Sequence, residues 1–288
     1  MIRLIAIDMD GTILSPDHTV SKKNKKTILE AQSNGIEIVI ATGRSFSEAF
    51  DPISNEGLNL AYICLNGADV RNEYGELLSS THIEESDMNK IISILDAYAI
   101  DHQLFIDTVV YTKSIEGPID AFIQLAEDAG QIPPVDEIRK EVMDRVEKGA
   151  LLQLDSFDEL INQRGSDIYK VFGTSFDRER LDLARAALKQ LPRLAVSSSG
   201  AGNLEITSVN AQKGIAVEQY AKSKGISMKN VMVIGDNQND LSMMKRAGRS
   251  VAMGNAPDEI KAVCTNVTAS NANDGVALAI EAILQPQF

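Results

Sequence analysis

Two aspartates one residue apart are the residues of this chain best placed to do chemistry. Leu4–Ile7 is an apolar run that predicts a buried strand, and residues 8–12 continue it as Asp-Met-Asp-Gly-Thr. Because residues i and i+2 of a strand point the same way, Asp8 and Asp10 are expected to face one site at the strand's carboxyl end. Mg²⁺ would relieve the repulsion between the two carboxylates. A carboxylate beside such a cation can also accept a phosphoryl group as a nucleophile. The alternative is a solvated Asp-Gly turn, which is common.

A second strand ends in a segment with the composition of an anion site. Thr42 and Gly43 follow the apolar run Ile36–Ala41 and precede a predicted helix. A hydroxyl, a close-approach glycine and free backbone N–H groups at a helix start bind anions, although a simple threonine cap has the same composition. We place the next residue, Arg44, outside the site, because an arginine at a helix start is more often structural or solvent-facing.

Two further segments carry side chains that suit a phosphate and a cation. Lys213 opens another predicted helix and can offset negative charge, although most lysines are solvated. The strand Val231–Ile234 runs into a turn that contains Asp236, Asn239 and Asp240. Carboxylates again stand at the end of a strand, although a solvated Asp/Asn-rich turn is the plain alternative.

The elements around these segments predict an α/β fold. Strands alternate with helices over residues 1–82 and again over 208–288, which indicates a Rossmann-like core with a parallel sheet. The first predicted helix, Ser21–Asn34, is capped by Ser21, and Asp69–Ser80 is expected to form a hairpin.

Residues 83–207 change this rhythm and predict an inserted α+β cap domain, whose last expected strand is Leu194–Ser197. Pro118, Pro133-Pro134 and the charged segment Asp136–Lys148 are expected to break the insert into surface-exposed pieces.

Composition limits the class of protein. The chain has 288 residues, 44% of them hydrophobic and 24% charged, with a net charge of −13. Such a charge argues against nucleic acid and against an anionic membrane surface as partners. Cys64 and Cys264 form no Cys-x-x-Cys pair, no signal-peptide pattern occurs, and no apolar stretch is long enough to span a bilayer. We expect a reduced, cytoplasmic protein. His18, His82 and His102 match no metal or triad spacing, and we interpret His82 as a linker residue and the other two as surface residues.

Taken together, these motifs resemble those of the haloacid dehalogenase-like hydrolase superfamily, and within it the Cof-type sugar and cofactor phosphatases. The shared segments occur in family order and cover the core nearly end to end; they are residues 8–12, 42–44, 66–68, 213–214, 235–240, 251–256 and 273–276. The insert matches the family only in position and in its α+β character.

The resemblance implies a Mg²⁺-dependent phosphatase of small phosphorylated metabolites. Asp8 would attack phosphorus and form an aspartyl-phosphate. Asp10 would donate a proton to the leaving alkoxide and would then take a proton from the hydrolytic water. Asp8, Asp236 and the main-chain carbonyl of Asp10 would bind Mg²⁺, and Asp240 would hold the waters of the metal. The donors to the phosphate oxygens would be Met9, Thr42, Gly43, Lys213 and Asn239.

The cap would close over this site and contact the leaving group, with Tyr169 and Lys170 as polar candidates. The sequence leaves open which phosphorylated substrate is used, and it leaves the oligomeric state open. A phosphomutase or phosphotransferase on the same scaffold is the main alternative. A signalling receiver domain is disfavoured by the Asp8/Asp10 pair and the large insert, and a ligand-binding relative without activity is disfavoured by the complete set of catalytic residue types.

Overall fold

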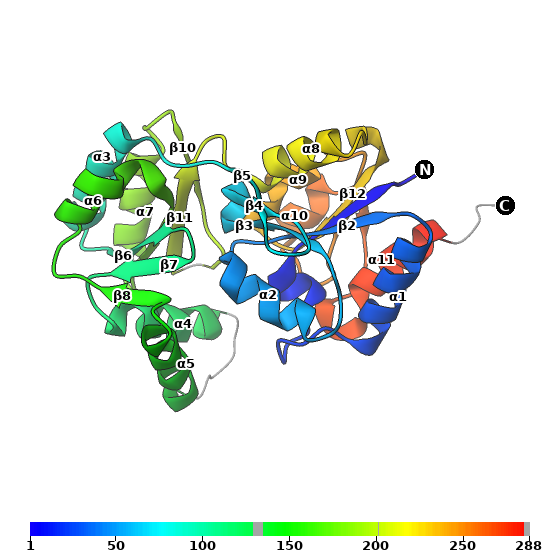
Figure 1. The fold of residues 1–288 in the computed structure, drawn as a ribbon, viewed down its shortest axis with the longest axis horizontal. Coiled ribbons are helices and arrows are strands. Elements are labelled where there is room, and N and C mark those ends of the chain that lie inside the picture. The colour runs from blue at the N-terminus through cyan, green and yellow to red at the C-terminus, as the bar shows by residue number, and fades with distance from the viewer. Residues whose placement is uncertain (129–134, 201, 285–288) are drawn as a thin grey trace. The chain divides into compact units, whose positions relative to one another are not determined.

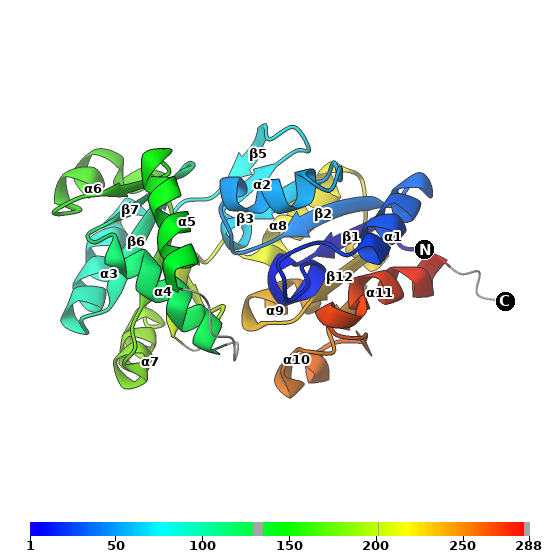
Figure 2. The ribbon, with the colours of Figure 1, turned by 90° about the horizontal axis from the view of Figure 1, so that it is seen from below.

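The chain is divided into two compact units in the computed structural model, which describes residues 1–128, 135–200 and 202–284. The core unit consists of Met1–Ser80 and Ala211–Phe288, and the insert unit of Thr81–Asn210. The boundaries expected from the sequence lie at 82/83 and 207/208. Figure 1 and Figure 2 draw the units in two perpendicular views.

A mixed sheet forms the centre of the core unit, with the strand order β14-β13-β12-β1-β2-β3-β4-β5 among the described residues. The strands are β1 (Leu4–Ile7), β2 (Glu37–Ala41), β3 (Ala61–Cys64), β4 (Asp69–Arg71), β5 (Leu77–Ser80), β12 (Val231–Gly235), β13 (Arg249–Ala252) and β14 (Asn266–Val267). In the order across the sheet, the six strands from β14 to β3 pair in parallel. The strands β4 and β5 form the expected hairpin at one side. The parallel strands therefore share a carboxyl edge, where they end, and an amino edge, where they begin.

Helices cover both faces of this sheet, as Figure 1 shows. They are α1 (Lys22–Ser33), α2 (Phe46–Ser54), α8 (Lys213–Ser223), α9 (Leu241–Met244), α10 (Asp258–Val263) and α11 (Gly275–Leu284). Ser21 caps α1 as predicted, because its hydroxyl oxygen accepts a hydrogen bond from the Asn24 amide at 3.0 Å.

The middle strands of the core are buried on both faces. In β1, Leu4 and Ala6 pack in a cluster with Val217 of α8 and Met243 of α9, and every residue of the strand is buried. Burial on both faces explains why the sequence of this strand is continuously apolar rather than alternating. This packing determines where the strands end, and so where the residues that follow them are placed.

The insert unit has its own sheet, with the strand order β10-β11-β9-β6-β7-β8 in the described part of the chain. Its strands are β6 (Asp101–Ile106), β7 (Val109–Thr112), β8 (Leu151–Gln153), β9 (Ile168–Thr174), β10 (Leu194–Ser197) and β11 (Asn203–Ser208). Its helices are α3 (Glu85–Ala97), α4 (Glu116–Asp128), α5 (Val135–Glu147), α6 (Asp158–Arg164) and α7 (Arg178–Leu188). Side chains of α3, α6 and α7 form a hydrophobic cluster with the sheet.

Two elements of the insert differ from the prediction. The charged segment Asp136–Lys148 is mostly exposed as predicted, but nearly all of it forms the helix α5 (Val135–Glu147), which was not expected and which buries Val142 completely. Because a helix needs only a narrow apolar stripe to pack, a mostly charged sequence can form one. The second element, β11, was not expected; it pairs with both β10 and β9. Pro118 lies in the first turn of α4, where proline is tolerated, and Pro133-Pro134 lies outside the described residues.

Of the three histidines, His102 was wrongly placed at the surface. It lies in β6 with 2% of its area exposed, and its ring packs against Phe157 with a centroid distance of 5.5 Å. Its Nδ1 lies 2.9 Å from the Ile100 carbonyl oxygen. His18 is exposed, and Cys64 is buried as predicted.

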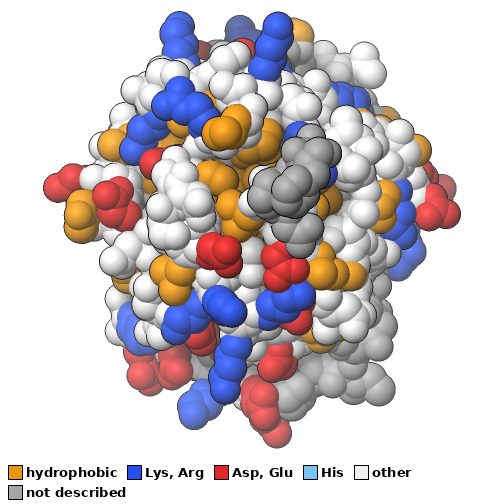
Figure 3. Space-filling model, turned by 90° about the vertical axis from the view of Figure 1, so that its right-hand side faces the viewer, with side chains coloured by type: hydrophobic (Ala, Val, Ile, Leu, Met, Phe, Trp, Pro, Cys, Tyr) orange, Lys and Arg blue, Asp and Glu red, His pale blue; other side chains and the backbone are white. Residues whose placement is uncertain are grey.

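The surface of the chain mixes charges of both signs. On the face in Figure 3, lysine and arginine side chains are interspersed with aspartate and glutamate. Lys23 lies 3.5 Å from Glu281, and Lys25 lies 3.7 Å from Glu56. No helix among the described residues is both long enough and apolar enough to cross a membrane.

Candidate active site

Three carboxylates converge at the carboxyl edge of the core sheet. Asp8 follows β1, Asp236 follows β12, and Asp240 lies on the short helical turn after Asp236. One oxygen from each lies within 4.8 Å of the others. The parallel pairing of β1 with β12 brings Asp8 and Asp236 together, although 228 positions separate them in the sequence.

A fully buried lysine lies between two of these carboxylates. Lys213, the first residue of α8, has its Nζ atom 2.6 Å from Asp8 Oδ1 and 2.7 Å from Asp240 Oδ1. None of its surface is exposed. The interpretation of this lysine as a solvated surface residue is therefore excluded.

The negative charge at this edge exceeds what Lys213 can balance. Burial, together with repulsion from Asp240, raises the pKa of Asp8 to about 7, although Lys213 opposes the change. For Asp236, burial and the charges of Asp8 and Asp240 raise the pKa to about 9. The same neighbours raise the pKa of Lys213 above its usual value despite its burial. Such a donor set suits a hard divalent cation, which would let all three carboxylates ionise.

Of the three carboxylates, Asp240 is already occupied by protein donors. Its Oδ1 accepts from Lys213, and its Oδ2 accepts from the backbone amides of Asp236 and Asn237 at 3.0 and 3.1 Å. It is completely buried. Asp240 thus holds both the lysine side chain and the loop that carries Asp236.

Asp236 forms hydrogen bonds with Thr12 of the turn after β1 and with Asn255, which also binds that turn. The Thr12 hydroxyl donates to its Oδ1 at 3.2 Å, and the Asn255 amide donates to the Gly11 carbonyl at 2.9 Å and reaches Asp236 Oδ2 at 3.5 Å. Gly11 has a φ of +77°, and a Cβ atom there would lie 2.4 Å from Asp236 Oδ2. Only glycine therefore allows the turn after β1 to approach Asp236 this closely.

The second aspartate of the motif, Asp10, is bound by Arg44, a residue that was expected to lie outside the site. Arg44 Nε donates to Asp10 Oδ2 at 2.9 Å, and Nη2 donates to Asp10 Oδ1 at 2.5 Å. Burial acts to raise the pKa of Asp10, but the charge and hydrogen bonds of Arg44 outweigh burial and lower the pKa. Asp10 lies in the turn Met9–Ile13 rather than in the strand itself. The two aspartates therefore have different partners and opposite pKa shifts.

The remaining predicted residues lie at the same edge. Thr42 and Gly43 follow β2, the strand beside β1, and the Thr42 hydroxyl oxygen accepts from the Arg44 amide at 3.1 Å. Met9 follows Asp8 and is fully buried. Asn239 precedes Asp240 and donates through Nδ2 to Asn66 Oδ1 at 3.3 Å.

Thr12, Asn66 and Asn255 were not among the predicted site residues, although all three lie in the motifs that carry the resemblance. Their positions after β1, β3 and β13 are the available signal, because each follows the carboxyl end of a strand. Thr12 and Asn255 engage Asp236, and Asn66 engages Asn239.

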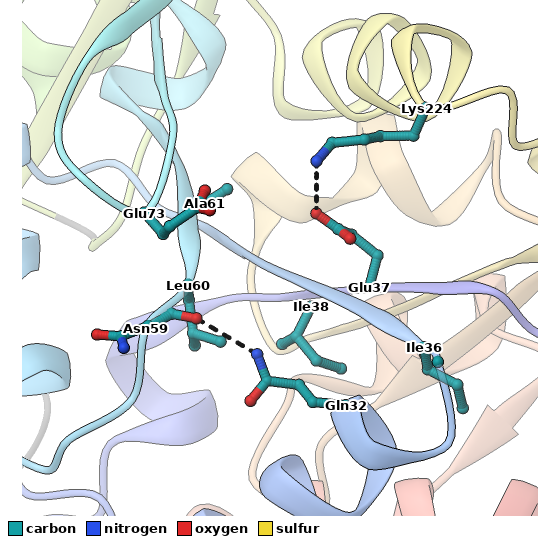
Figure 4. A pocket seen from close by; sticks show the side chains of 10 residues that line it. Gln32, Ile36, Glu37, Ile38, Asn59, Leu60, Ala61, Glu73 and Lys224 are labelled. Carbon is teal, nitrogen blue, oxygen red and sulfur yellow. Dashed lines mark hydrogen bonds and ion pairs between the residues drawn. The ribbon is translucent and has the colours of Figure 1, made fainter.

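A different hollow lies at the amino edge of the same sheet (Figure 4) and has a volume of about 300 Å³. Its lining includes Glu37 at the start of β2 and Lys224 after α8, whose side chains point toward one another in Figure 4. Glu37 Oε1 accepts from Lys224 Nζ at 3.0 Å and from the Tyr220 hydroxyl at 2.6 Å. Here the carboxylate is satisfied by protein donors, and the side chains of the ion pair are 36% and 42% exposed.

In the insert unit, Tyr169 and Lys170 are both buried in β9. Lys170 Nζ lies 2.8 Å from Glu205 Oε1 and lies 5.2 Å from the ring centroid of Phe172. Tyr169 stacks on His82 with a centroid distance of 4.6 Å.

Comparison with known proteins identifies the family. A family model for haloacid dehalogenase-like hydrolases matches residues 5–280. The chain belongs to the haloacid dehalogenase-like hydrolases. It is 30% identical over 278 residues to phosphatase YwpJ of Bacillus subtilis, covering 96% of this chain and 98% of YwpJ.

Two further relatives also match along almost their whole length. The chain is 30% identical over 288 residues to 5-amino-6-(5-phospho-D-ribitylamino)uracil phosphatase YwtE of Bacillus subtilis, covering all of both chains. A solved structure of a haloacid dehalogenase-like hydrolase from B. subtilis is similar to this chain with a TM-score of 0.86 and 29% identity, covering 98% of this chain and all of that one. The predicted family and the parallel-sheet α/β fold are thereby confirmed.

Proposed function

We propose that this protein is a Mg²⁺-dependent phosphatase that hydrolyses small phosphorylated metabolites through an aspartyl-phosphate on Asp8. The observation that carries the proposal is the cluster of Asp8, Asp236 and Asp240 around Lys213 at the carboxyl edge. Its excess of negative charge is the environment in which a divalent cation and a phosphate dianion can be bound together. Relatives named as phosphatases support the same reaction class.

Asp8 and Asp236, with the main-chain carbonyl of Asp10, are the proposed ligands of Mg²⁺. The occupation of both Asp240 oxygens by protein donors supports leaving Asp240 outside the ligand set and assigning it to the waters of the metal. When bound, the cation neutralises charge and so permits one anion to approach another.

Each remaining residue has a role in the proposed reaction. Asp8 forms a bond to phosphorus while the bond from phosphorus to the ester oxygen breaks, and Asp10 gives its proton to that oxygen. Water then attacks phosphorus, Asp10 takes its proton, and the Asp8–phosphorus bond breaks. The donors that hold the phosphoryl oxygens are the backbone groups of Met9 and Gly43 and the side chains of Thr42, Lys213 and Asn239.

The insert unit is the proposed cap that contacts the leaving group and excludes water. Tyr169 and Lys170 are the proposed contacts in its sheet. The substrate class includes sugar phosphates and phosphorylated cofactors. YwtE is named for a compound that joins a phosphorylated sugar alcohol to a heterocycle, which supports this range. A cytoplasmic location and the absence of nucleic acid or membrane partners stay predictions from composition.

The test is a panel of phosphorylated metabolites assayed for free phosphate, with Mg²⁺ and with EDTA. We expect release from at least one ester with Mg²⁺, loss of release in EDTA, and no release by Asp8→Asn. Phosphate release that persists in EDTA would overturn the metal dependence. Transfer to a sugar hydroxyl without free phosphate, or a requirement for a bisphosphate activator, would instead indicate the phosphotransferase or phosphomutase alternative.

A further inference from the structure

Arg44 is anchored by its backbone just after β2, the strand beside β1. Its amide donates to the Thr42 hydroxyl oxygen at 3.1 Å, and its carbonyl accepts from the Leu65 amide at 2.9 Å. These bonds hold the residue at the carboxyl edge, two positions before α2 begins. The origin of its side chain is therefore as well fixed as the strand ends themselves.

The guanidinium contacts both oxygens of Asp10. The two bonds of 2.9 and 2.5 Å run from Nε and Nη2, and this paired geometry fixes the plane of a carboxylate as well as its position. The third nitrogen, Nη1, donates to the Glu48 carbonyl at 3.3 Å in the first turn of α2. The guanidinium is thus tied to both the helix and the aspartate.

Among the described residues, Arg44 alone forms hydrogen bonds to the Asp10 side chain. Its side chain is 51% exposed, whereas that of Arg44 is 28% exposed. The turn that carries Asp10 includes Gly11 in a left-handed conformation. A proton donor that can rotate into several rotamers would seldom face the ester oxygen, and misplacement of a catalytic group costs rate steeply.

We propose that Arg44 is a positioning residue that aims the Asp10 carboxyl group at the bridging ester oxygen. This inference rests on the proposed phosphatase function. The two-bond pair matches the ionised form of Asp10, which accepts a proton from water. When Asp10 carries that proton, its carbonyl oxygen still accepts one bond from the guanidinium. The guanidinium therefore keeps the Asp10 carboxyl group in the same orientation through both halves of the reaction.

The dependence of rate on the leaving group separates this role from other roles. p-Nitrophenyl phosphate releases a stable phenolate that needs no proton, whereas a primary alkyl phosphate releases an alkoxide that does. The value of kcat/KM reports the first half of the reaction, in which the leaving group departs. A residue that positions the acid therefore changes the ratio of kcat/KM for the two esters, whereas a residue that binds the phosphoryl group or supports the fold lowers both equally.

The experiment compares the two esters in the unsubstituted protein and in Arg44→Ala, Arg44→Lys and Arg246→Ala. Arg246 pairs with Glu218 at 3.0 Å on an exposed part of the core unit and serves as the matched control. We expect Arg44→Ala to lower kcat/KM about 10²-fold for the alkyl ester and less than about threefold for the nitrophenyl ester. Arg44→Lys, which keeps the charge but not the paired bonds, should lie between. Arg246→Ala should leave both values unchanged.

A double variant and a folding control complete the design. In Asp10→Asn, removal of Arg44 should cause no further loss with the alkyl ester, because the two residues act as one unit. Thermal midpoints show whether each variant folds. Equal losses with both esters in folded Arg44→Ala or Arg44→Lys would overturn the positioning role. If the unsubstituted protein hydrolysed neither ester nor any metabolite of the panel, the proposed function itself would be overturned.

Discussion

The two edges of the core sheet hold similar charged groups, but the pKa values of their carboxyl groups are shifted in opposite directions. At the carboxyl edge, burial and crowding raise the pKa of Asp8 to about 7 and of Asp236 to about 9. At the amino edge, burial acts to raise the pKa of Glu37, but hydrogen bonds from Tyr220 and Lys224 outweigh it and lower the pKa. Each edge has a lysine next to a carboxylate, so residue type alone does not explain the difference.

What differs is the ratio of acids to donors and their access to water. Lys213 is completely buried and shares its ammonium between two carboxylates, with Asp236 close by. Lys224 is 42% exposed and contacts Glu37, which has a tyrosine donor as well. The carboxyl edge therefore has unsatisfied affinity for positive charge, whereas the amino edge is satisfied by its own side chains. This contrast supports the proposal that the active site lies at the carboxyl edge.

The largest expected effect is the loss of the nucleophile. Asp8→Asn should lower kcat by roughly 10⁴-fold or more, because no other group can form the covalent intermediate. The fold should remain intact, since the change removes one of the mutually repelling carboxylates. Phosphate release and far-UV circular dichroism measure the two outcomes. Glu37→Gln at the amino edge should keep full activity. Near-normal turnover by Asp8→Asn would remove Asp8 from the mechanism.

The two lysines give the next contrast. Lys213→Met should lower kcat/KM by about 10²- to 10³-fold, since a donor to the phosphoryl oxygens is lost. It should also lower the free energy of unfolding by about 3 kcal/mol or more, because buried carboxylates are left without their cation. Lys224→Met should leave kcat/KM unchanged and cost less than about 1 kcal/mol, as exposed ion pairs do. Equal effects of the two substitutions on rate and on denaturant midpoint would contradict the contrast between the edges.

Metal binding should stabilise the protein through the carboxyl edge alone. At 100 times its dissociation constant, Mg²⁺ should add about 2.7 kcal/mol to the free energy of unfolding. Thermal midpoints with Mg²⁺ and with EDTA measure this difference. Asp236→Asn should abolish it, and Glu37→Gln should preserve it. A Mg²⁺ effect that survives in Asp236→Asn would place the cation elsewhere.

In EDTA, the pH dependence of stability should have a definite sign. Asp8 and Asp236 have pKa values in the folded protein above the usual 3.8. Their contribution to the free energy of unfolding is therefore fully present below about pH 4 and is lost as the pH rises through about 7 and then about 9. The metal-free protein should therefore have a lower thermal midpoint at pH 8.5 than at pH 5.5. Asp236→Asn should flatten this slope. A midpoint that rises over this interval, equally in both proteins, would contradict the assigned pKa shifts.

The smallest effect is expected for Glu37, with the opposite sign. Folding lowers the pKa of Glu37, so its contribution to the free energy of unfolding is present above about pH 4.5. This contribution is lost as the pH falls through the pKa of Glu37 in the folded protein. Because the side chain is 36% exposed, Glu37→Gln should cost less than about 1 kcal/mol at pH 7. The difference in denaturant midpoint between the variant and the unsubstituted protein should be smaller at pH 4 than at pH 7. A difference that grows toward pH 4 would contradict this interpretation.

The sequence predicted the core better than it predicted the insert. In the core, continuous apolar strands alternate with capped helices, and β1, β2 and β12 lie within one residue of the expected bounds. In the insert, α5 was missed because its charged residues conceal a narrow apolar stripe, and β11 was missed although Asn203–Ser208 alternates apolar with polar residues over part of its length. Sheet pairing with distant strands, rather than a local signal, buries all of β11.

Within the site, strand ends were predictable, but side-chain pairing was not. The positions of Asp8, Thr42 and Asp236 follow from parallel pairing, since all three come just after neighbouring strands. The capture of Asp10 by Arg44 depends on the turn Met9–Ile13 and on rotamers that no spacing rule describes. Burial of Lys213 likewise depends on how α8 packs against the sheet.

The central claim, that the Asp8 carboxylate accepts phosphorus, can be tested by chemical trapping. The protein is mixed with Mg²⁺ and a hydrolysed ester, quenched in acid during turnover, and reduced with tritiated borohydride, which converts an acyl-phosphate to homoserine. Digestion and mass spectrometry then locate the modified residue. We expect homoserine at position 8, dependent on substrate and absent in Asp8→Asn. An unmodified Asp8 during active turnover, or modification at another carboxylate, would contradict it.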